Sequence, residues 1–163
     1  MKKKRKVRYL FCLFLAVMLA GILTPAVRAA EDVKLTTGQT VYVPIYSHIY
    51  SGFKVRPFDL AATLSVRNTD PKNSITITSV KYYDTDGNLI KEYLDAPIQL
   101  KALASTRYII LEGDKTGGSG ANFIVKWKST AAVNPPIIAG VMIGTRSGQG
   151  ISFISYGRVI KDD

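Results

Sequence analysis

Between Phe58 and Asn68, apolar side chains recur at every second position. A period of two is the repeat of an extended strand, in which neighbouring side chains point to opposite faces. The pattern therefore predicts a strand with one face on a core and the other in solvent. The predicted core face carries Phe58, Leu60, Ala62, Leu64 and Val66, and the opposite face carries Asp59, Ala61, Thr63, Ser65 and Arg67.

Seven further segments have the composition of strands, and no stretch between them has a helical period. A shift of the apolar phase around Ser79 predicts a β-bulge, and Asp86-Gly87 suits a tight hairpin turn. The other predicted strands are Thr40–Tyr46, Ile75–Asp84, Leu89–Leu94, Thr106–Glu112, Asn122–Lys128, Ile137–Thr145 and Ile151–Ile160.

Short strands at this spacing predict an all-β fold, a single antiparallel β-sandwich of seven to nine strands with immunoglobulin/fibronectin-like strand spacing. A closed barrel remains an alternative on the pattern alone. Leu64 and Trp127 are predicted core residues, whereas Thr63 is predicted on the opposite face.

The N-terminus has the three parts of a secretory signal. A basic head at residues 2–8 precedes an uncharged apolar run, Tyr9–Leu23, and small residues follow up to Ala29. The run is shorter than the roughly 20 residues of a membrane-spanning helix, which favours a cleaved signal over a retained anchor. We therefore expect a signal peptide at 1–29, a lead-in at 30–39, one β-sandwich domain at 40–160 and a tail at 161–163.

The expected location is periplasmic or secreted, with membrane attachment only through the signal segment if it is uncleaved. Seven of the 22 basic residues precede Ala30, and the remaining 15 against 12 acidic residues leave a net charge of +3. Such a charge gives no reason to expect nucleic acid as a partner. The single cysteine, Cys12, lies in the signal, so we expect no disulfide after cleavage.

The chain resembles a domain-of-unknown-function family of small exported bacterial proteins. The resemblance implies export and one compact domain, and it carries over no activity. The stretches that carry it are Tyr42–Tyr50 (YVPIYSHIY), Leu60–Pro71 (LAATLSVRNTDP), Ile75–Asp84 (ITITSVKYYD), Gly117–Phe123 (GGSGANF) and Met142–Gly150 (MIGTRSGQG).

His48 is the only histidine in the chain. A lone histidine without a cysteine or a second histidine is a poor zinc ligand set. Ser47 beside it is not expected to form a nucleophile–base pair with it, because adjacent residues of a strand point to opposite faces. The favoured interpretation is a histidine that is hydrogen-bonded locally, and contact with a ligand is the alternative.

Two loops resemble ligand-binding loops without meeting their requirements. Asp84, Asp86 and Asn88 alternate as in a calcium loop, but the glycine and the glutamate of such a loop are not at their positions. Gly117–Gly120 precedes a strand, whereas a phosphate-binding loop precedes a helix. A hairpin turn and a flexible connection are the favoured interpretations, and no cofactor or metal is expected.

Five residues are candidates for contact with a ligand or partner. Arg146 and Gln149 are predicted at a loop tip, Asn122 at a strand start, and His48 with Tyr50 just after the first strand. Convergence of Asn122, His48 and Gln149 would make a hydrogen-bonding site without evident catalytic power.

The leading hypothesis is a non-enzymatic module of the cell envelope that binds a protein or a glycan through loops at one end of the sandwich. The absence of a nucleophile–base set favours it over an enzyme. One alternative is an envelope-polymer hydrolase that uses His48 with Asp59, Asp114 or Glu112. The other is a structural subunit that associates by strand addition at an open sheet edge.

Overall fold

A computed structural model describes residues 34–51, 55–146 and 148–162, so the predicted signal peptide at 1–29 lies outside the described residues. The described part is all-β, and it contains no helix that could cross a membrane. It has more strands than the seven to nine predicted. The strands are β1 (Thr36–Pro44), β2 (His48–Ser51), β3 (Arg56–Asp59), β4 (Ala61–Arg67), β5 (Ile75–Tyr83), β6 (Leu89–Glu92), β7 (Ile98–Leu100), β8 (Ser105–Ile110), β9 (Asn122–Val133), β10 (Ile137–Arg146), β11 (Gln149–Tyr156) and β12 (Arg158–Asp162).

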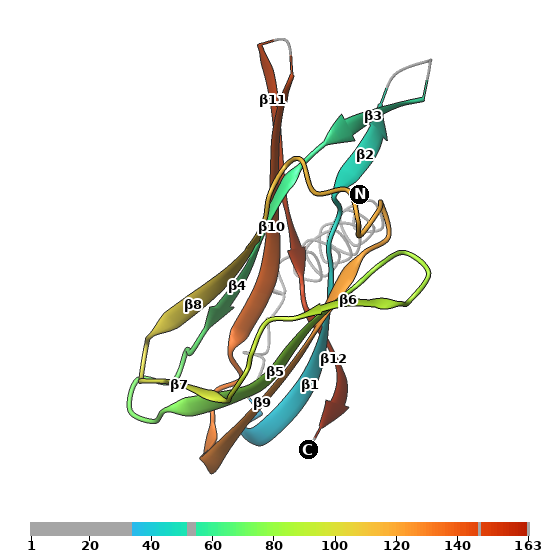
Figure 1. Cartoon of the computed structure of the whole chain (residues 1–163). Helices are drawn as coiled ribbons and strands as arrows, with labels where there is room; N and C mark the ends of the chain where they lie inside the picture. The colour runs from blue at the N-terminus through green and yellow to red at the C-terminus, as the bar shows by residue number, and fades with distance from the viewer. Residues whose placement is uncertain (1–33, 52–54, 147, 163) are drawn as a thin grey trace, which may run out of the picture. The chain divides into compact units, whose positions relative to one another are not determined.

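Two antiparallel sheets form the sandwich (Figure 1). The first sheet has the order β12-β1-β9-β5-β6, with β7 also paired to β5, and the second has the order β11-β10-β4-β8. A separate hairpin, β2–β3, extends beyond them. The predicted antiparallel sandwich is therefore confirmed.

Alternation places the core between the two sheets. Leu64 on β4 and Leu60 just before it are fully buried, and Trp127 on β9 faces them from the other sheet, also buried. Thr63 is partly exposed on the outer side of β4, as predicted. Truncating Leu64 to Ala is expected to cost about 2–5 kcal/mol because it leaves a cavity in this core.

Two predicted strands are divided, and in both cases the prediction of one continuous strand was wrong. The segment beginning at Phe58 breaks at Leu60, whose backbone N–H donates to Ser47 O at 2.9 Å. The segment Ile151–Ile160 breaks at Gly157, after which the chain leaves the second sheet and pairs with β1 in the first. A Cβ on Gly157 would lie 2.6 Å from a Val41 methyl group, so the crossing requires glycine.

The predicted bulge and turn in β5 are confirmed. The register of β5 against β9 shifts between Ile77 and Ser79, where the apolar phase changes. The hairpin that follows contains Gly87 at φ 85°, a conformation that glycine adopts without strain.

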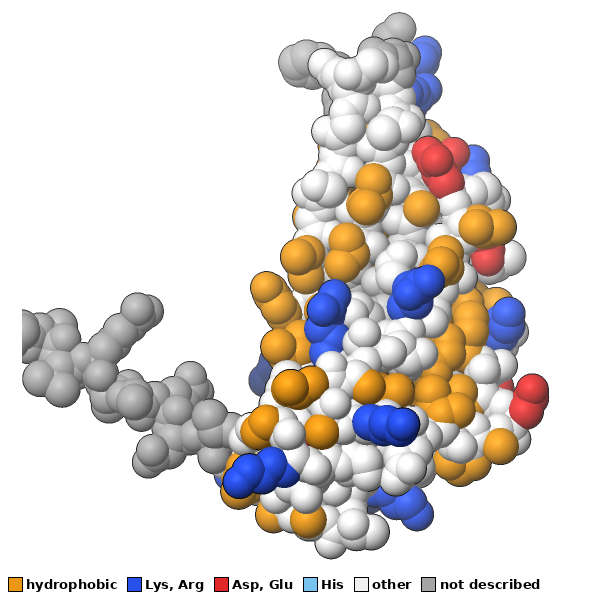
Figure 2. All heavy atoms as spheres, turned by 90° about the vertical axis from the view of Figure 1, so that its left-hand side faces the viewer, with side chains coloured by type: hydrophobic (Ala, Val, Ile, Leu, Met, Phe, Trp, Pro, Cys, Tyr) orange, Lys and Arg blue, Asp and Glu red, His pale blue; other side chains and the backbone are white. Residues whose placement is uncertain are grey.

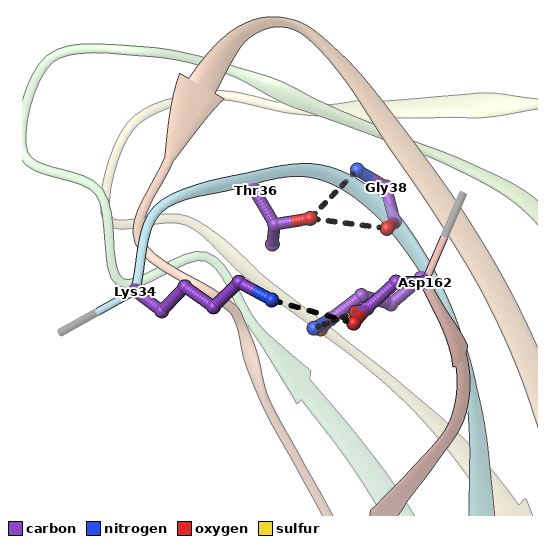
Figure 3. A network of polar contacts seen from close by, with 5 residues as sticks. Lys34, Thr36, Gly38 and Asp162 are labelled. Atoms are coloured by element: carbon purple, nitrogen blue, oxygen red, sulfur yellow. Dashed lines mark hydrogen bonds and ion pairs between the residues drawn. The ribbon is translucent and has the colours of Figure 1, made fainter.

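The first and last strands lie side by side, and side-chain contacts join them (Figure 3). Gln39 Nε2 donates to Asp162 Oδ1 at 3.0 Å, and Lys34 Nζ lies 3.7 Å from Asp162 Oδ2. The strand β1 begins at Thr36, within the stretch expected as a lead-in, and β12 extends to Asp162, within the expected tail.

One end of the sandwich, which we call the closed end, is made by the turns around Asn68, Leu103 and Asn134. Asn68 is buried, and its Nδ2 donates to Asn73 O and Lys101 O at 2.8 and 2.9 Å. Asp70 is also buried and accepts the backbone N–H groups of Lys72 and Asn73. These hydrogen bonds hold the pKa of the Asp70 carboxyl below its usual value.

Candidate functional site

The opposite end, which we call the hairpin end, carries the β2–β3 and β10–β11 hairpins, both of which extend upward in Figure 1. The turn after β5 and the loop between β8 and β9 lie at the same end. Backbone bonds tie this loop to the chain that enters β2: Ile45 N donates to Ala121 O at 2.8 Å, and Ser47 N donates to Gly118 O at 3.1 Å. These hydrogen bonds hold the backbone at the base of the β2–β3 hairpin.

A pocket of about 410 Å³ lies at the hairpin end. It is formed where β3 meets the end of β10, and the Arg146 guanidinium joins the two strands by donating from Nη1 to Pro57 O at 3.1 Å. The lining combines two guanidinium groups with two carboxylates. The lining residues are Arg56, Pro57, Phe58, Asp59, Glu112, Thr145 and Arg146.

Asp59 is the most constrained polar residue of this pocket. Its Oδ2 lies 2.9 Å from Lys115 Nζ in an ion pair. Its Oδ1 is buried and has no hydrogen-bond partner among the described residues. A buried carboxylate oxygen without a donor costs free energy.

His48 lies next to Asp59 across the β2–β3 ladder, but its ring bonds elsewhere. Its Nδ1 is 3.2 Å from Ser47 Oγ, and its Nε2 is 3.2 Å from Tyr50 Oη. The His48 and Tyr50 rings also meet edge to face, with centroids 5.2 Å apart. Among the described residues, no hydrogen bond joins His48 to a carboxylate.

Ser47 and His48 contact each other, so the reason for not expecting a nucleophile–base pair, side chains on opposite faces of a strand, was wrong. Ser47 lies in a bend before β2, not within the strand, so the two side chains can approach. The Ser47 hydroxyl donates to Gly118 O at 2.9 Å and is fully buried. It can therefore only accept from His48 Nδ1–H, which is the reverse of the proton direction that a nucleophile–base pair requires.

The glycine loop at 117–120 is held by its own protein contacts. The hydroxyl and the backbone N–H of Thr85 both donate to Gly117 O, at 3.0 and 2.9 Å. Thr85 Oγ1 in turn accepts the N–H of Gly120 at 3.0 Å, and Gly118 N donates to Lys115 O. With these two N–H groups engaged, the loop does not offer them to a phosphate, and it is a fixed connection.

The acidic turn after β5 is equally self-contained. Asp84 Oδ1 accepts the N–H groups of Asp86 and Asn88 at 2.9 and 2.7 Å, and Asp84 Oδ2 accepts from Asn88 Nδ2 at 3.0 Å. The side-chain bond from Asn88 is the largest cause of the lowered pKa of the Asp84 carboxyl. Hydrogen bonds within the hairpin turn therefore engage both carboxylate oxygens of Asp84.

Four of the five predicted contact residues occupy neighbouring positions. Arg146 pairs with Gln149 across the β10–β11 ladder, and Arg146 reaches Pro57, which pairs with Tyr50. Tyr50 in turn contacts His48. Asn122 stands apart on the first sheet, between Pro44 and Tyr83, with no described side-chain contact to the other four.

Of the predicted contact residues, only Arg146 lines the pocket. Glu112 and Asp59 were predicted from the sequence only as acid–base groups of the hydrolase alternative. Arg56 was not predicted as a site residue. The signal that could have found Arg56 is its charge next to Pro57, directly before the alternating segment. Sequence reasoning assigned that position to a connection because β2 and β3 were not recognised as a hairpin.

Three comparisons relate this chain to known proteins. A family model described as "Protein of unknown function (DUF3124)" matches residues 38–160. No curated protein matches the chain. One solved structure, titled "Crystal Structure of Thermotoga maritima 1070", is similar over 77% of this chain and 97% of its own, at 9% identity and a TM-score of 0.46.

Proposed function

The chain belongs to the DUF3124 family, whose description states no function, and from this premise we propose that it is an exported, non-enzymatic module that binds an envelope glycan at the hairpin end. The observation that carries the proposal is the pocket in which Arg56, Arg146, Asp59 and Glu112 meet. Export is supported by the basic head, apolar run and small-residue exit at 1–29.

A sugar ring presents hydroxyl groups that donate and accept at once, so it suits a site that offers both kinds of partner. The guanidinium groups of Arg56 and Arg146 donate only, whereas the carboxylates of Asp59 and Glu112 accept only. The carboxylate of Glu112, which is exposed, can accept from a hydroxyl. The volume of about 410 Å³ lies within the range of small-ligand pockets and fits one or two sugar rings.

Tyr50 adds an apolar surface beside the pocket. Its side chain is 57% exposed, and it lies opposite Pro57, one of the lining residues. The edge-to-face contact with His48 and the bond to Nε2 fix the ring without burying it. An exposed, fixed tyrosine ring presents a flat apolar face with a polar tip, which suits the face of a sugar.

The proposal is tested by calorimetric titration of the protein with soluble peptidoglycan fragments and with neutral oligosaccharides. Glu112→Gln and Arg56→Ala are expected to weaken glycan binding about tenfold, since each removes a hydrogen bond to a charged group. Lys101→Ala at the closed end serves as the matched control and is expected to bind as the wild type does. Equal binding by all variants, or no glycan binding at all, would contradict the proposal.

A hydrolase of an envelope polymer is the second candidate, because the two carboxylates Asp59 and Glu112 line one pocket. Against it stand the ion pair of Asp59 with Lys115 and the local bonding of His48. The same titrations decide between the two if the product is analysed. New reducing ends that disappear in Glu112→Gln would establish the hydrolase, whereas the binding module returns the glycan intact.

A further inference from the structure

The outer face of the second sheet carries large apolar side chains and few charged ones. Residues paired across neighbouring strands share a face. One cross-strand row of this outer face is Ile154, Val141, Thr63 and Ile109, in the order β11, β10, β4, β8. The row below it is Tyr156, Ala139, Ser65 and Arg107.

The large side chains of this face are exposed. Ile109, Ile143 and Ile154 are each slightly more than half exposed, and Tyr156 is 71% exposed. Figure 2 looks onto the side of the molecule where β8 and β4 lie in Figure 1, and it shows groups of exposed hydrophobic side chains separated by Lys and Arg side chains. An exposed apolar face of this kind marks a surface for association.

Charged residues divide unequally between the two sheets. The strands β4, β8, β10 and β11 contain three arginines, at 67, 107 and 146, and no lysine, aspartate or glutamate. The strands of the first sheet contain five lysines, at 81, 91, 126, 128 and 161. Arginine and tyrosine are enriched in protein interfaces, whereas lysine and the acidic residues are depleted there.

We propose that this outer face binds a second copy of the same chain, with a twofold axis parallel to the strands and between β10 and β4. Such an axis places β11 of one copy over β8 of the second copy, and β10 over its β4. Each cross-strand row of one copy then faces the same row of the other copy. Ile154 then meets Ile109, and Ile143 meets Ala61, a large side chain opposite a small one. Self-complementarity of this kind is the requirement of a twofold interface.

The same axis places Tyr156 of one copy opposite Arg107 of the other, twice in the dimer. Among the described residues, no hydrogen bond or ion pair engages the Arg107 guanidinium, and Arg107 and Tyr156 are both exposed. A guanidinium over a tyrosine ring is a favourable pair that needs no carboxylate. The face, which has no acidic residue on its strands, thus provides its own partner for Arg107.

The size of the face agrees with a modest dimer. Four strands about 4.8 Å apart, with six or more residues each at about 3.3 Å, give a projected area of roughly 400 Å² per copy. Side-chain relief increases the accessible area above this projection. The total buried by two copies then approaches the lower limit of specific interfaces, roughly 1,000 Å².

The test is sedimentation equilibrium over a range of concentrations. The sample is the protein expressed from its whole sequence and purified from the cells that produce it. We expect a reversible dimer. Arg107→Glu is expected to weaken dimerisation by about tenfold or more, because it removes both cation–π contacts. Lys126→Glu, an equal change of charge on the exposed side of the first sheet, is the matched control and is expected to leave the dimer intact.

A charge swap tests the axis itself. In the double variant Arg107→Glu with Tyr156→Lys, the two new charges face each other across the interface, so dimerisation is expected to recover most of the tenfold loss. Thermal denaturation of each variant checks that the fold is retained. The proposal is overturned if the wild type stays monomeric, or if the monomer binds anionic phosphatidylglycerol vesicles in a flotation assay. It is also overturned if the double variant dimerises no more tightly than Arg107→Glu.

Discussion

The two ends of the sandwich use polar side chains in opposite ways. At the closed end, Asn68 and Asp70 are buried, and each bonds backbone groups of more than one segment. At the hairpin end, Arg56 and Glu112 are exposed, and they offer donors and acceptors to the pocket that they line. Polar side chains therefore hold the fold at one end and offer contacts at the other.

The difference teaches that the type of a polar residue does not reveal its role. A polar atom that is bonded to the backbone in a dry site is part of the fold, and its loss destabilises the protein. A polar atom that faces solvent above a fixed backbone is available to a ligand, and its loss leaves stability nearly unchanged.

Among changes that compare the two ends, the largest effect is expected for Asn68→Ala at the closed end. This change removes the bonds to Asn73 O and Lys101 O and the acceptor of the Asp70 N–H. Because these backbone groups then lack a partner in a buried site, the free energy of unfolding should fall by about 3 kcal/mol, measured by urea denaturation. Asn122→Ala at the hairpin end is the control, with an expected change below about 0.5 kcal/mol. Equal losses would abolish the contrast.

The next largest effect is expected for Gly144→Ala, which changes the backbone next to the pocket. A Cβ at this position would lie 2.5 Å from Asp59 O and 2.6 Å from a ring carbon of Phe58, both part of the pocket lining. Overpacking of this kind should lower stability by about 2 kcal/mol and weaken glycan binding as well. Gly113→Ala, where a Cβ meets nothing within 4 Å, should change neither. A stable Gly144→Ala with intact binding would show that β3 moves freely.

A smaller effect of opposite sign is expected for Leu103→Gly at the closed end. Leu103 adopts a φ of 58°, which strains any residue with a Cβ. Glycine removes this strain, and the net gain in unfolding free energy should be about 1 kcal/mol, since glycine also adds freedom to the unfolded chain. Leu103→Ala loses the same exposed side chain but keeps its Cβ, so thermal denaturation should show no gain for it.

The smallest effect is expected from the carboxyl groups of Asp70 and Asp84, and it concerns how stability depends on pH. Both groups accept hydrogen bonds in the folded protein, and both have a pKa below the ordinary 3.8. A group with a lowered pKa in the folded state stabilises the protein above its unfolded pKa, and this stability is lost as the pH falls through the folded value. Stability should therefore decline below about pH 4. Asp70→Asn should flatten this decline more than Asp84→Asn, because Asp70 joins separate segments whereas Asp84 bonds only its own turn. Urea denaturation between pH 2 and 6 measures both.

Much of the fold follows from local pattern. Alternation placed Leu60, Leu64 and Trp127 in the core, and all three are buried. The phase shift at Ser79 and the glycine at 87 marked a bulge and a turn that the structure contains. These features were predictable because each depends on residues that are close in the sequence.

The candidate site was only partly predictable. Arg146 was identified because it precedes a glycine-rich turn, but its neighbours in the pocket come from residues about 34 and 90 positions earlier in the chain. Ser47 and His48 were expected to diverge, and a bend before β2 brings them together. No local pattern carries this information, because it depends on how strands pair and where the chain bends.

The sequence alone determined that this chain forms strands, which face of the strand at 61–67 is buried, and where the bulge and the turn of β5 lie, because a side-chain period and a glycine act over a few residues. Only the tertiary structure decided that the strand after Gly157 changes sheet, that Asp59 and Glu112 share a pocket with two arginines, and that the second sheet has an apolar outer face. A strand keeps its alternation whichever sheet it joins, so its partners are chosen by packing between distant segments.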